Sequence, residues 1–174
     1  TTWSAQRQGP YFRRELVYRS DDGTVVFHGS TFSVLLDVEN RTVFRKKATP
    51  FEVGEPFESF TIDASPALDR QEGHERLEVR KVRNSHLDAL GHVNNTRYGE
   101  FAHDALEEAE CRNLSNLGRI DLQFVSELRR DDTFSVWKAV SDDRICIQGR
   151  KEADGTLSFE CRFTFGQAAS GSQS

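Results

Sequence analysis

Helical periodicity is confined to one stretch of this chain, and that restriction narrows the folds open to it. Apolar side chains recur there at spacings of three and four residues, at Tyr98, Phe101, Ala102, Ala105, Leu106 and Ala109. This spacing aligns them along one face of an amphipathic helix. We therefore predict a single helix that is capped by Asn94 or Asn95 and ends near residues 111–118.

Strand patterns lie on both sides of the predicted helix. Before it, residues 74–83 predict a strand with a bulge or at a sheet edge, because their alternation is imperfect. After it, alternating apolar residues predict four strands, around residues 120–124, 134–140, 145–147 and 157–165. This order predicts an α+β domain over residues 74–166, in which a curved antiparallel sheet wraps around the helix. An α+β roll without a catalytic role has the same order of elements.

The N-terminal part of the chain predicts strands and no helix. We expect strands over residues 11–19, 24–38 and 41–46. Asp22 and Gly23 predict a tight hairpin turn, since this pair accepts positive backbone angles. A sheet with one apolar face needs a covering layer, which these strands do not supply by themselves.

The proline content marks a boundary between the two parts. Residues 48–73 hold three of the four prolines and show little apolar period, which predicts a linker. Residues 1–47 then form a separate group of strands before the linker. The small and polar residues 167–174 predict a disordered tail.

Composition excludes several classes of protein. Apolar residues make up 36% and charged residues 29%, as in globular domains, and the net charge of -5 argues against general nucleic-acid binding. No run is long enough to span a bilayer. Cys111, Cys146 and Cys161 form no close pair, which favours a reduced, cytoplasmic setting. The chain has no methionine, so we expect a processed or partial protein.

Polar residues gather just before the predicted helix. Asp88, His92, Asn94 and Asn95 lie within eight positions, with Gly91 among them. Unpaired N–H groups and the positive dipole end of a helix attract developing negative charge, so this arrangement suits the stabilisation of an oxyanion. The alternative is that the asparagines only cap the helix and the other two residues belong to a surface loop.

The string LDALGHVNNTRY resembles the signature of hotdog-fold thioesterases, and most closely that of the acyl-acyl carrier protein thioesterases. The segment SVLLDVENRTVFR is similar, more weakly, to the end of that family's first repeat. The resemblance implies a tandem hotdog fold. Residues 1–47 would be an incomplete first repeat, and residues 74–166 a complete second repeat. It also implies that a second copy or a segment absent from this sequence covers the N-terminal strands.

The resemblance assigns roles to individual residues. Asp88 would be the nucleophile or the general base, and His92 would polarise the thioester carbonyl or orient Asp88. Glu127, after IDLQFVS, matches the family's glutamate, although a glutamate at a strand end is ordinarily solvated. Leu90 departs from the pattern, since the plant members have asparagine at this position. Leu128 replaces a cysteine often found there.

Substrate contacts are expected from two groups of residues. Backbone N–H groups around Gly91 and at Asn94, Asn95 and Thr96 are the expected oxyanion donors. Arg129 and Arg130 would face an acidic acyl carrier protein, although most basic clusters are simply solvated.

The predicted function is release of a fatty acid from acyl carrier protein by thioester hydrolysis. The alternatives are a hotdog acyl-coenzyme A thioesterase and a non-catalytic acyl-binding protein, the latter because of Leu90. We expect no cofactor, no metal site, no nucleic acid and no membrane span. The expected location is the cytoplasm, or a plastid if the source is a plant.

Overall fold

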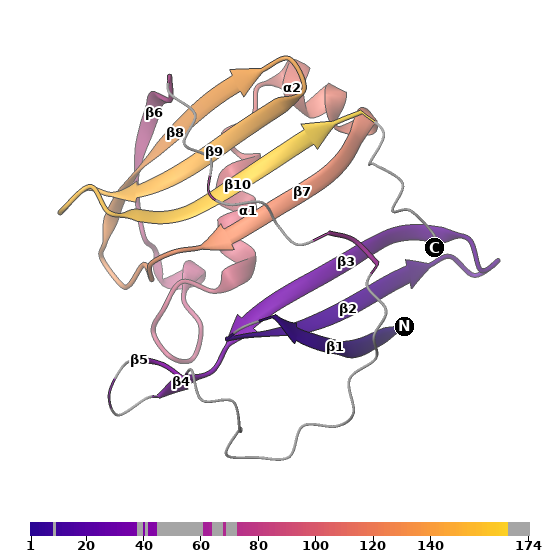
Figure 1. The fold of residues 1–174 in the computed structure, drawn as a ribbon. Coiled ribbons are helices and arrows are strands. Elements are labelled where there is room, and N and C mark those ends of the chain that lie inside the picture. Colours follow the sequence, from indigo (N-terminus) through magenta and orange to yellow (C-terminus); the bar gives the residue numbers. More distant parts are fainter. Residues whose placement is uncertain are drawn as a thin grey trace. The chain divides into compact units, whose positions relative to one another are not determined.

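The computed structural model describes residues 1–8, 10–37, 40, 42–44, 61–63, 68 and 73–166 (Figure 1). The chain divides into two compact units, with the boundary between residues 65 and 66. The predicted linker at 48–73 lies largely outside the described residues, and the predicted tail at 167–174 lies wholly outside them. Both stay predictions. No helix in the described ranges is long and apolar enough to cross a membrane.

The first unit contains an antiparallel three-stranded sheet in the order β1-β2-β3 and a short hairpin, β4-β5. Its strands are β1 (Thr2–Gln8), β2 (Tyr11–Arg19), β3 (Val25–Val34), β4 (Leu36–Asp37) and β5 (Thr42–Val43). The predicted hairpin between β2 and β3 is confirmed, but of the expected pair Gly23 has a positive φ, 88°, and Asp22 does not. The predicted strand at 24–38 is divided into β3 and β4. Strand β1 was not predicted from the apolar pattern, and backbone pairing along β2 holds it in place.

A buried ion pair lies at the centre of the three-stranded sheet. Arg13 and Glu15, both on β2, are almost fully buried and contact each other. The Glu15 carboxylate also accepts hydrogen bonds from the Ser30 hydroxyl (2.7 Å) and from the Thr61 N–H (2.9 Å). Burial by itself raises the pKa of Glu15, but the hydrogen bonds from Thr61, Arg13 and Ser30 outweigh it and lower that pKa below its ordinary value.

The second unit is a five-stranded antiparallel sheet in the order β6-β8-β9-β10-β7. Its strands are β6 (Glu75–Lys81), β7 (Leu117–Phe124), β8 (Thr133–Ser141), β9 (Arg144–Lys151) and β10 (Leu157–Phe165). The predicted order of strand, helix and four strands is confirmed. The imperfect alternation before the helix has two causes, because β6 is an edge strand and its pairing with β8 shifts between Arg76 and Glu78.

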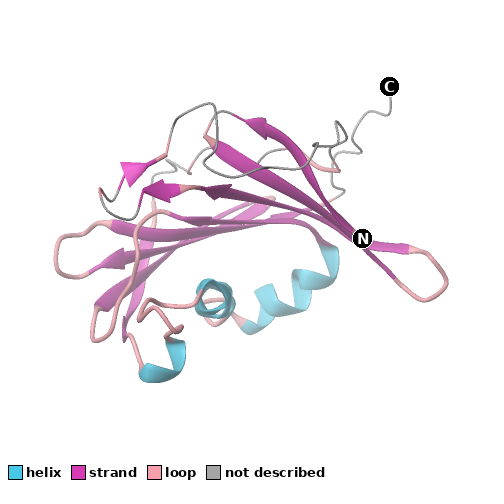
Figure 2. Cartoon of the chain, turned by 90° about the horizontal axis from the view of Figure 1, so that it is seen from below, coloured by secondary structure: helices cyan, strands magenta, loops and turns pink. Residues whose placement is uncertain are grey.

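The helices of the second unit lie against one face of its sheet (Figures 1 and 2). They are the 3-10 turn η1 (Asn84–His86), α1 (Asn95–His103), α2 (Glu108–Asn113) and the 3-10 turn η2 (Leu114–Asn116). Phe101 and Ala102 of α1 pack with Phe134 and Phe159 of the sheet to form the core. Phe101 and Phe134 lie with ring centroids 5.1 Å apart.

The prediction of one continuous helix is wrong. The chain leaves helical geometry at residues 104–107, where the Glu107 N–H donates to the Glu110 carboxylate (2.7 Å) and begins α2. Such reciprocal capping starts a new helix, because it satisfies backbone donors that a continuing helix would bond internally. Ala109 is exposed and does not belong to the buried stripe.

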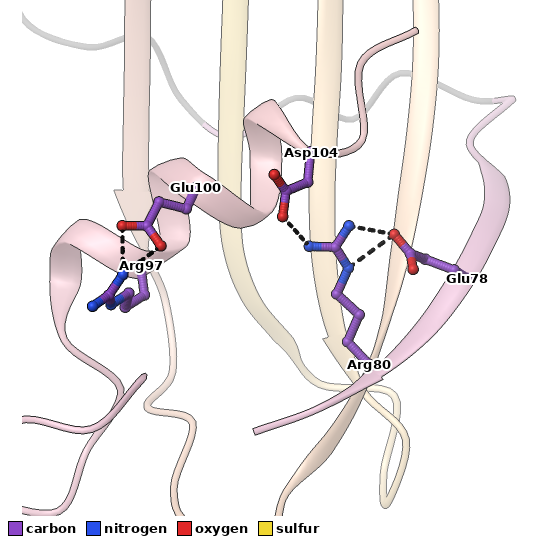
Figure 3. Close-up of polar contacts among 5 residues, drawn as sticks. All are labelled: Glu78, Arg80, Arg97, Glu100 and Asp104. Carbon is purple, nitrogen blue, oxygen red and sulfur yellow. Dashed lines mark hydrogen bonds and ion pairs between the residues drawn. The ribbon is translucent and has the colours of Figure 1, made fainter. Parts of the chain in front are cut away.

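A charged link fixes the end of α1 to the edge of the sheet (Figure 3). The Arg80 guanidinium, on β6, donates to the Glu78 carboxylate (2.8 Å) and to Asp104 just after α1 (3.0 Å). Arg97 and Glu100 form a separate pair on the exposed side of the helix (2.6 Å). Arg80 therefore holds the C-terminal end of α1 in register with β6.

Two strand patterns differ from expectation at the margins of the sheet. Lys138 breaks the alternation of β8 because its ammonium group pairs with Glu107 and Glu110 at the start of α2, 3.1 Å from each. Ile120 and Phe124, predicted as inward residues of β7, are about half exposed, while Asp121 between them is buried. β7 is the other edge strand, which leaves its apolar side chains partly uncovered.

Candidate active site

A pocket of about 210 Å³ opens beside the N-terminal end of α1. It is formed where the turn at residues 87–94, the first turn of α1 and the segment after β7 come together. Its lining residues are Asp88, His92, Val93, Asn95, Tyr98, Phe124, Val125, Ser126 and Glu127. The structure thus brings the three predicted catalytic residues around one cavity. Glu127 reaches it from a segment 35 or more positions further along the sequence than Asp88 and His92.

Asp88 closes the turn that precedes the helix. Its Oδ1 accepts the N–H groups of Leu90 (2.8 Å) and His92 (3.1 Å). Its own N–H donates to the His92 carbonyl (2.8 Å). Gly91 has a φ of 77°, a backbone angle that glycine adopts without strain. Oδ2 accepts no hydrogen bond from the described residues, so one carboxylate oxygen builds the turn and the other is available in the pocket.

His92 and Glu127 face each other across the pocket. His92 Nε2 lies 3.5 Å from Glu127 Oε2, and both side chains are partly exposed. The same carboxylate oxygen accepts a hydrogen bond from Arg129 Nη2 (3.0 Å). The backbones on the two sides are joined, since Val93 N–H donates to the Leu128 carbonyl (2.9 Å). A carboxylate in this position can orient the imidazole ring.

Most of the predicted oxyanion donors are already used. The Gly91 N–H donates to the Asp88 carbonyl (3.1 Å), and the Asn94 N–H to the His86 carbonyl (2.8 Å). The Thr96 N–H donates to the Asn94 side chain (3.0 Å), which makes Asn94 the helix cap. These hydrogen bonds correct the broader prediction. Among the described residues, only Asn95 of this group lines the pocket with both its N–H and its side-chain amide without a partner.

The other residues singled out in the sequence lie outside the pocket. Leu90, where the plant pattern has asparagine, is 80% exposed and does not line it. Arg130 donates to the Asn84 side chain, whereas Arg129 contacts Glu127. The two arginines, predicted as one docking patch, therefore have different surroundings.

Sequence reasoning missed five lining residues, namely Val93, Tyr98, Phe124, Val125 and Ser126. Tyr98 was assigned to the buried stripe of the helix, and its ring does pack against Phe124 and Phe159 at centroid distances of 5.4 and 5.2 Å. A tyrosine in such a stripe carries a hydroxyl that needs a polar partner. That requirement could have predicted that Tyr98 lies next to polar groups. Burial raises the pKa of Tyr98, so its hydroxyl stays protonated.

The curved antiparallel sheet with its helix on one face, and a polar pocket at the helix N-terminus, define a hotdog fold. An acyl-ACP thioesterase from Bacteroides thetaiotaomicron has a similar structure, with a TM-score of 0.68 and 17% identity over 94% of this chain and 66% of that one. The 12:0-ACP thioesterase from Umbellularia californica is similarly related, with a TM-score of 0.69 and 16% identity over 94% and 65%. This chain spans about two thirds of the length of these structures.

The chain belongs to the acyl-ACP (acyl carrier protein) thioesterase family, because residues 69–168 match the model of the family's C-terminal domain. The expected family and fold are thereby confirmed. No protein of curated function matches the sequence.

Proposed function

We propose that the protein hydrolyses acyl thioesters, and that its substrate is an acyl group carried on acyl carrier protein. One observation carries the proposal: the free Asp88 oxygen, the His92–Glu127 pair and the unpartnered Asn95 donors line one pocket. Family membership supports the reaction class, and the two solved thioesterases named above support the carrier-protein substrate by analogy.

The chemistry follows from where each group lies. The thioester carbonyl oxygen is bound towards Asn95 at the N-terminal end of α1, whose N–H group and dipole stabilise the oxyanion as it forms. Asp88 either attacks the carbonyl carbon through Oδ2 or takes a proton from an attacking water. In the first route the bond from Oδ2 to the carbonyl carbon forms as the C–S bond breaks, which leaves a mixed anhydride and the thiolate. Water then hydrolyses the anhydride to the carboxylic acid and the free Asp88 carboxylate, and one proton of that water ends on the thiolate. In the second route a C–O bond forms, the C–S bond breaks, and the proton taken by Asp88 ends on the thiolate. The products are the carboxylic acid and the thiol.

His92 and Glu127 complete the site. The imidazole lies within reach of the pocket and is held by the Glu127 carboxylate, so it can donate to the carbonyl or the leaving sulfur. Val93, Phe124 and Val125 provide an apolar wall beside these polar groups, which suits the first carbons of an acyl chain. Leu90 stands where the plant members have asparagine, and it does not line the pocket. The side-chain amide that does line the pocket is that of Asn95.

The decisive experiment compares one acyl group on two carriers. The purified chain is assayed with the same acyl thioester of acyl carrier protein and of coenzyme A, and released thiol is measured. Faster turnover of the carrier-protein thioester, in terms of kcat/KM, is the expected result. Faster turnover of the coenzyme A thioester would favour the acyl-coenzyme A alternative. Binding without turnover of either would overturn the proposal of an enzyme.

A further inference from the structure

Glu127 is held in a segment without regular secondary structure. It lies three residues after the end of β7, in the connection that leads to β8. Its side chain is 52% exposed and contacts His92 and Arg129 at the surface of the pocket. Side chains on irregular segments reach catalytic precision only where the backbone beneath them is fixed. The position of the Glu127 carboxylate therefore depends on the contacts that hold the backbone of this segment.

Two buried hydroxyl groups bind the peptide groups on either side of Glu127. The Tyr98 hydroxyl accepts the N–H of Leu128, the residue after Glu127 (3.2 Å). The Ser158 hydroxyl donates to the carbonyl of Ser126, the residue before it (2.8 Å). Tyr98 is 3% exposed and Ser158 is fully buried.

The two hydroxyl groups come from different elements. Helix α1 supplies Tyr98, and β10 supplies Ser158. Tyr98 binds the peptide group that follows Glu127, and Ser158 binds the peptide group that precedes it. The backbone on both sides of Glu127 is therefore tied to the helix and to the sheet.

These hydrogen bonds to the flanking peptide groups constrain the direction of the Glu127 side chain. The two peptide planes that flank a residue set its φ and ψ, and these angles set the direction of its Cα–Cβ bond. The segment is further held because Val125 N–H and Ser126 N–H both donate to the Ser158 carbonyl (2.8 and 3.1 Å). Leu128, whose side chain is fully buried, accepts the Val93 N–H through its carbonyl. The backbone of Glu127 is thereby fixed relative to that of His92.

We propose that Tyr98 and Ser158 form a positioning pair, whose hydroxyl groups bind the two peptide groups that flank Glu127 and so hold its carboxylate against His92. The Tyr98 ring belongs to the core, and only its hydroxyl has this second role. Neither residue is a catalytic residue in this proposal, because both act through Glu127. Its effect on turnover rests on the proposed thioesterase function, whereas its effect on geometry does not.

The test removes each hydroxyl with little change in shape. In Tyr98→Phe and Ser158→Ala we expect kcat to fall by about tenfold or more, with KM within about twofold, as for other groups that orient catalytic side chains. In a Glu127→Ala background the same changes should cause no further loss of kcat, because the residue they position is gone. Equal losses in both backgrounds would overturn the proposal.

A matched control separates positioning from simple burial. Ser135, on β8, is buried like Ser158, and its hydroxyl donates to the Arg150 carbonyl (3.3 Å). Neither Ser135 nor Arg150 lines the pocket. Ser135→Ala should leave kcat and KM unchanged even if thermal stability falls. A loss of kcat in Ser135→Ala as large as that in Ser158→Ala would show that any buried hydroxyl matters equally, and would overturn the proposal.

A structural measurement does not depend on activity. In crystal structures of Tyr98→Phe and Ser158→Ala we expect the Glu127 carboxylate to leave its position 3.5 Å from His92. If Glu127 keeps that position in both variants, the positioning pair is disproved. If wild type hydrolyses no thioester but Glu127 moves in the variants, the proposed function fails while the positioning pair stands.

Discussion

At the scale of a single residue, the structural role of Asp88 can be separated from its proposed catalytic role. Oδ1 closes the turn before α1, while Oδ2 is available in the pocket. Asp88→Asn keeps an oxygen acceptor for the turn and removes the base or nucleophile. We expect turnover to fall by about 10²- to 10⁴-fold with little change in the thermal unfolding midpoint. The measurement is kcat on purified variants, with melting followed by circular dichroism.

Two further variants make this result specific. Asp88→Ala also loses the turn acceptor, so it should be less stable than Asp88→Asn as well as inactive. Asp142→Asn, at an exposed turn between β8 and β9, should behave as wild type. Near-normal turnover by a folded Asp88→Asn protein would contradict the assignment.

At this scale the sequence predicted part of the site. The motif around His92 and the glutamate after IDLQFVS were recognisable as short strings, and the structure brings them to one pocket. Ser158 was not recognisable, because a serine between Leu157 and Phe159 reads only as the polar position of an alternating strand. Its partner, the Ser126 carbonyl, comes from a distant part of the chain, and only the tertiary fold brings the two together.

The start of α1 gives a prediction at the scale of an element. Asn94 caps the helix through its side-chain oxygen, which accepts the Thr96 N–H (3.0 Å) and the Thr96 hydroxyl (2.9 Å). Asn94→Ala should lower the free energy of unfolding by about 1 kcal/mol, because it leaves a helix N–H without its partner. Asn94→Asp should retain most of the stability, since a carboxylate caps equally well and favours the helix dipole. Chemical denaturation monitored by fluorescence measures both, and equal stability of Asn94→Ala and wild type would contradict the cap.

The order of the helices and strands was predicted better than the residues at which they begin and end. Apolar periodicity predicted each strand of the second sheet, because it records which residues face the core. It did not reveal the break between α1 and α2, since Ala105 and Leu106 continue the helical spacing through it. Capping by Glu107 and Glu110 decided that break, and these residues also pair with Lys138 of β8. A tertiary contact therefore accounts for both the break in the helix and the presence of a lysine among the apolar residues of β8.

At the scale of the whole molecule, the buried Glu15 makes stability depend on pH. Its pKa in the folded protein is lowered below the ordinary value of 4.5. The unfolded chain therefore takes up this proton first as pH falls, and the stability contributed by Glu15 is present above pH 4.5 and lost as pH drops through the folded pKa. We expect wild type to be more stable than Glu15→Gln at pH 7, with a difference that narrows below pH 4.5.

Denaturant titrations over a pH series measure this difference. Glu108→Gln is the control, because Glu108 is 88% exposed and pairs with Arg112 on the surface of α2. It should differ little from wild type at any pH. A difference between Glu15→Gln and wild type that is constant from pH 7 to pH 3 would show that Glu15 does not titrate with folding.

The proposed binding of an acyl carrier protein gives the last prediction, in which substitutions of Arg129 and Arg130 have different effects. Arg129 contacts Glu127 (3.0 Å), so Arg129→Ala should lower kcat for carrier-protein and coenzyme A thioesters alike. Arg130 is exposed and donates to the Asn84 side chain, away from the residues that line the pocket, so Arg130→Ala should raise KM several-fold for the acidic carrier-protein substrate alone. That increase should fade at high salt, which screens charges between exposed surfaces. Arg112→Ala, an exposed arginine on α2, is the matched control and should leave both substrates unaffected. If Arg130→Ala raises KM equally for both thioesters, or does so independently of salt, Arg130 does not belong to a carrier-docking surface.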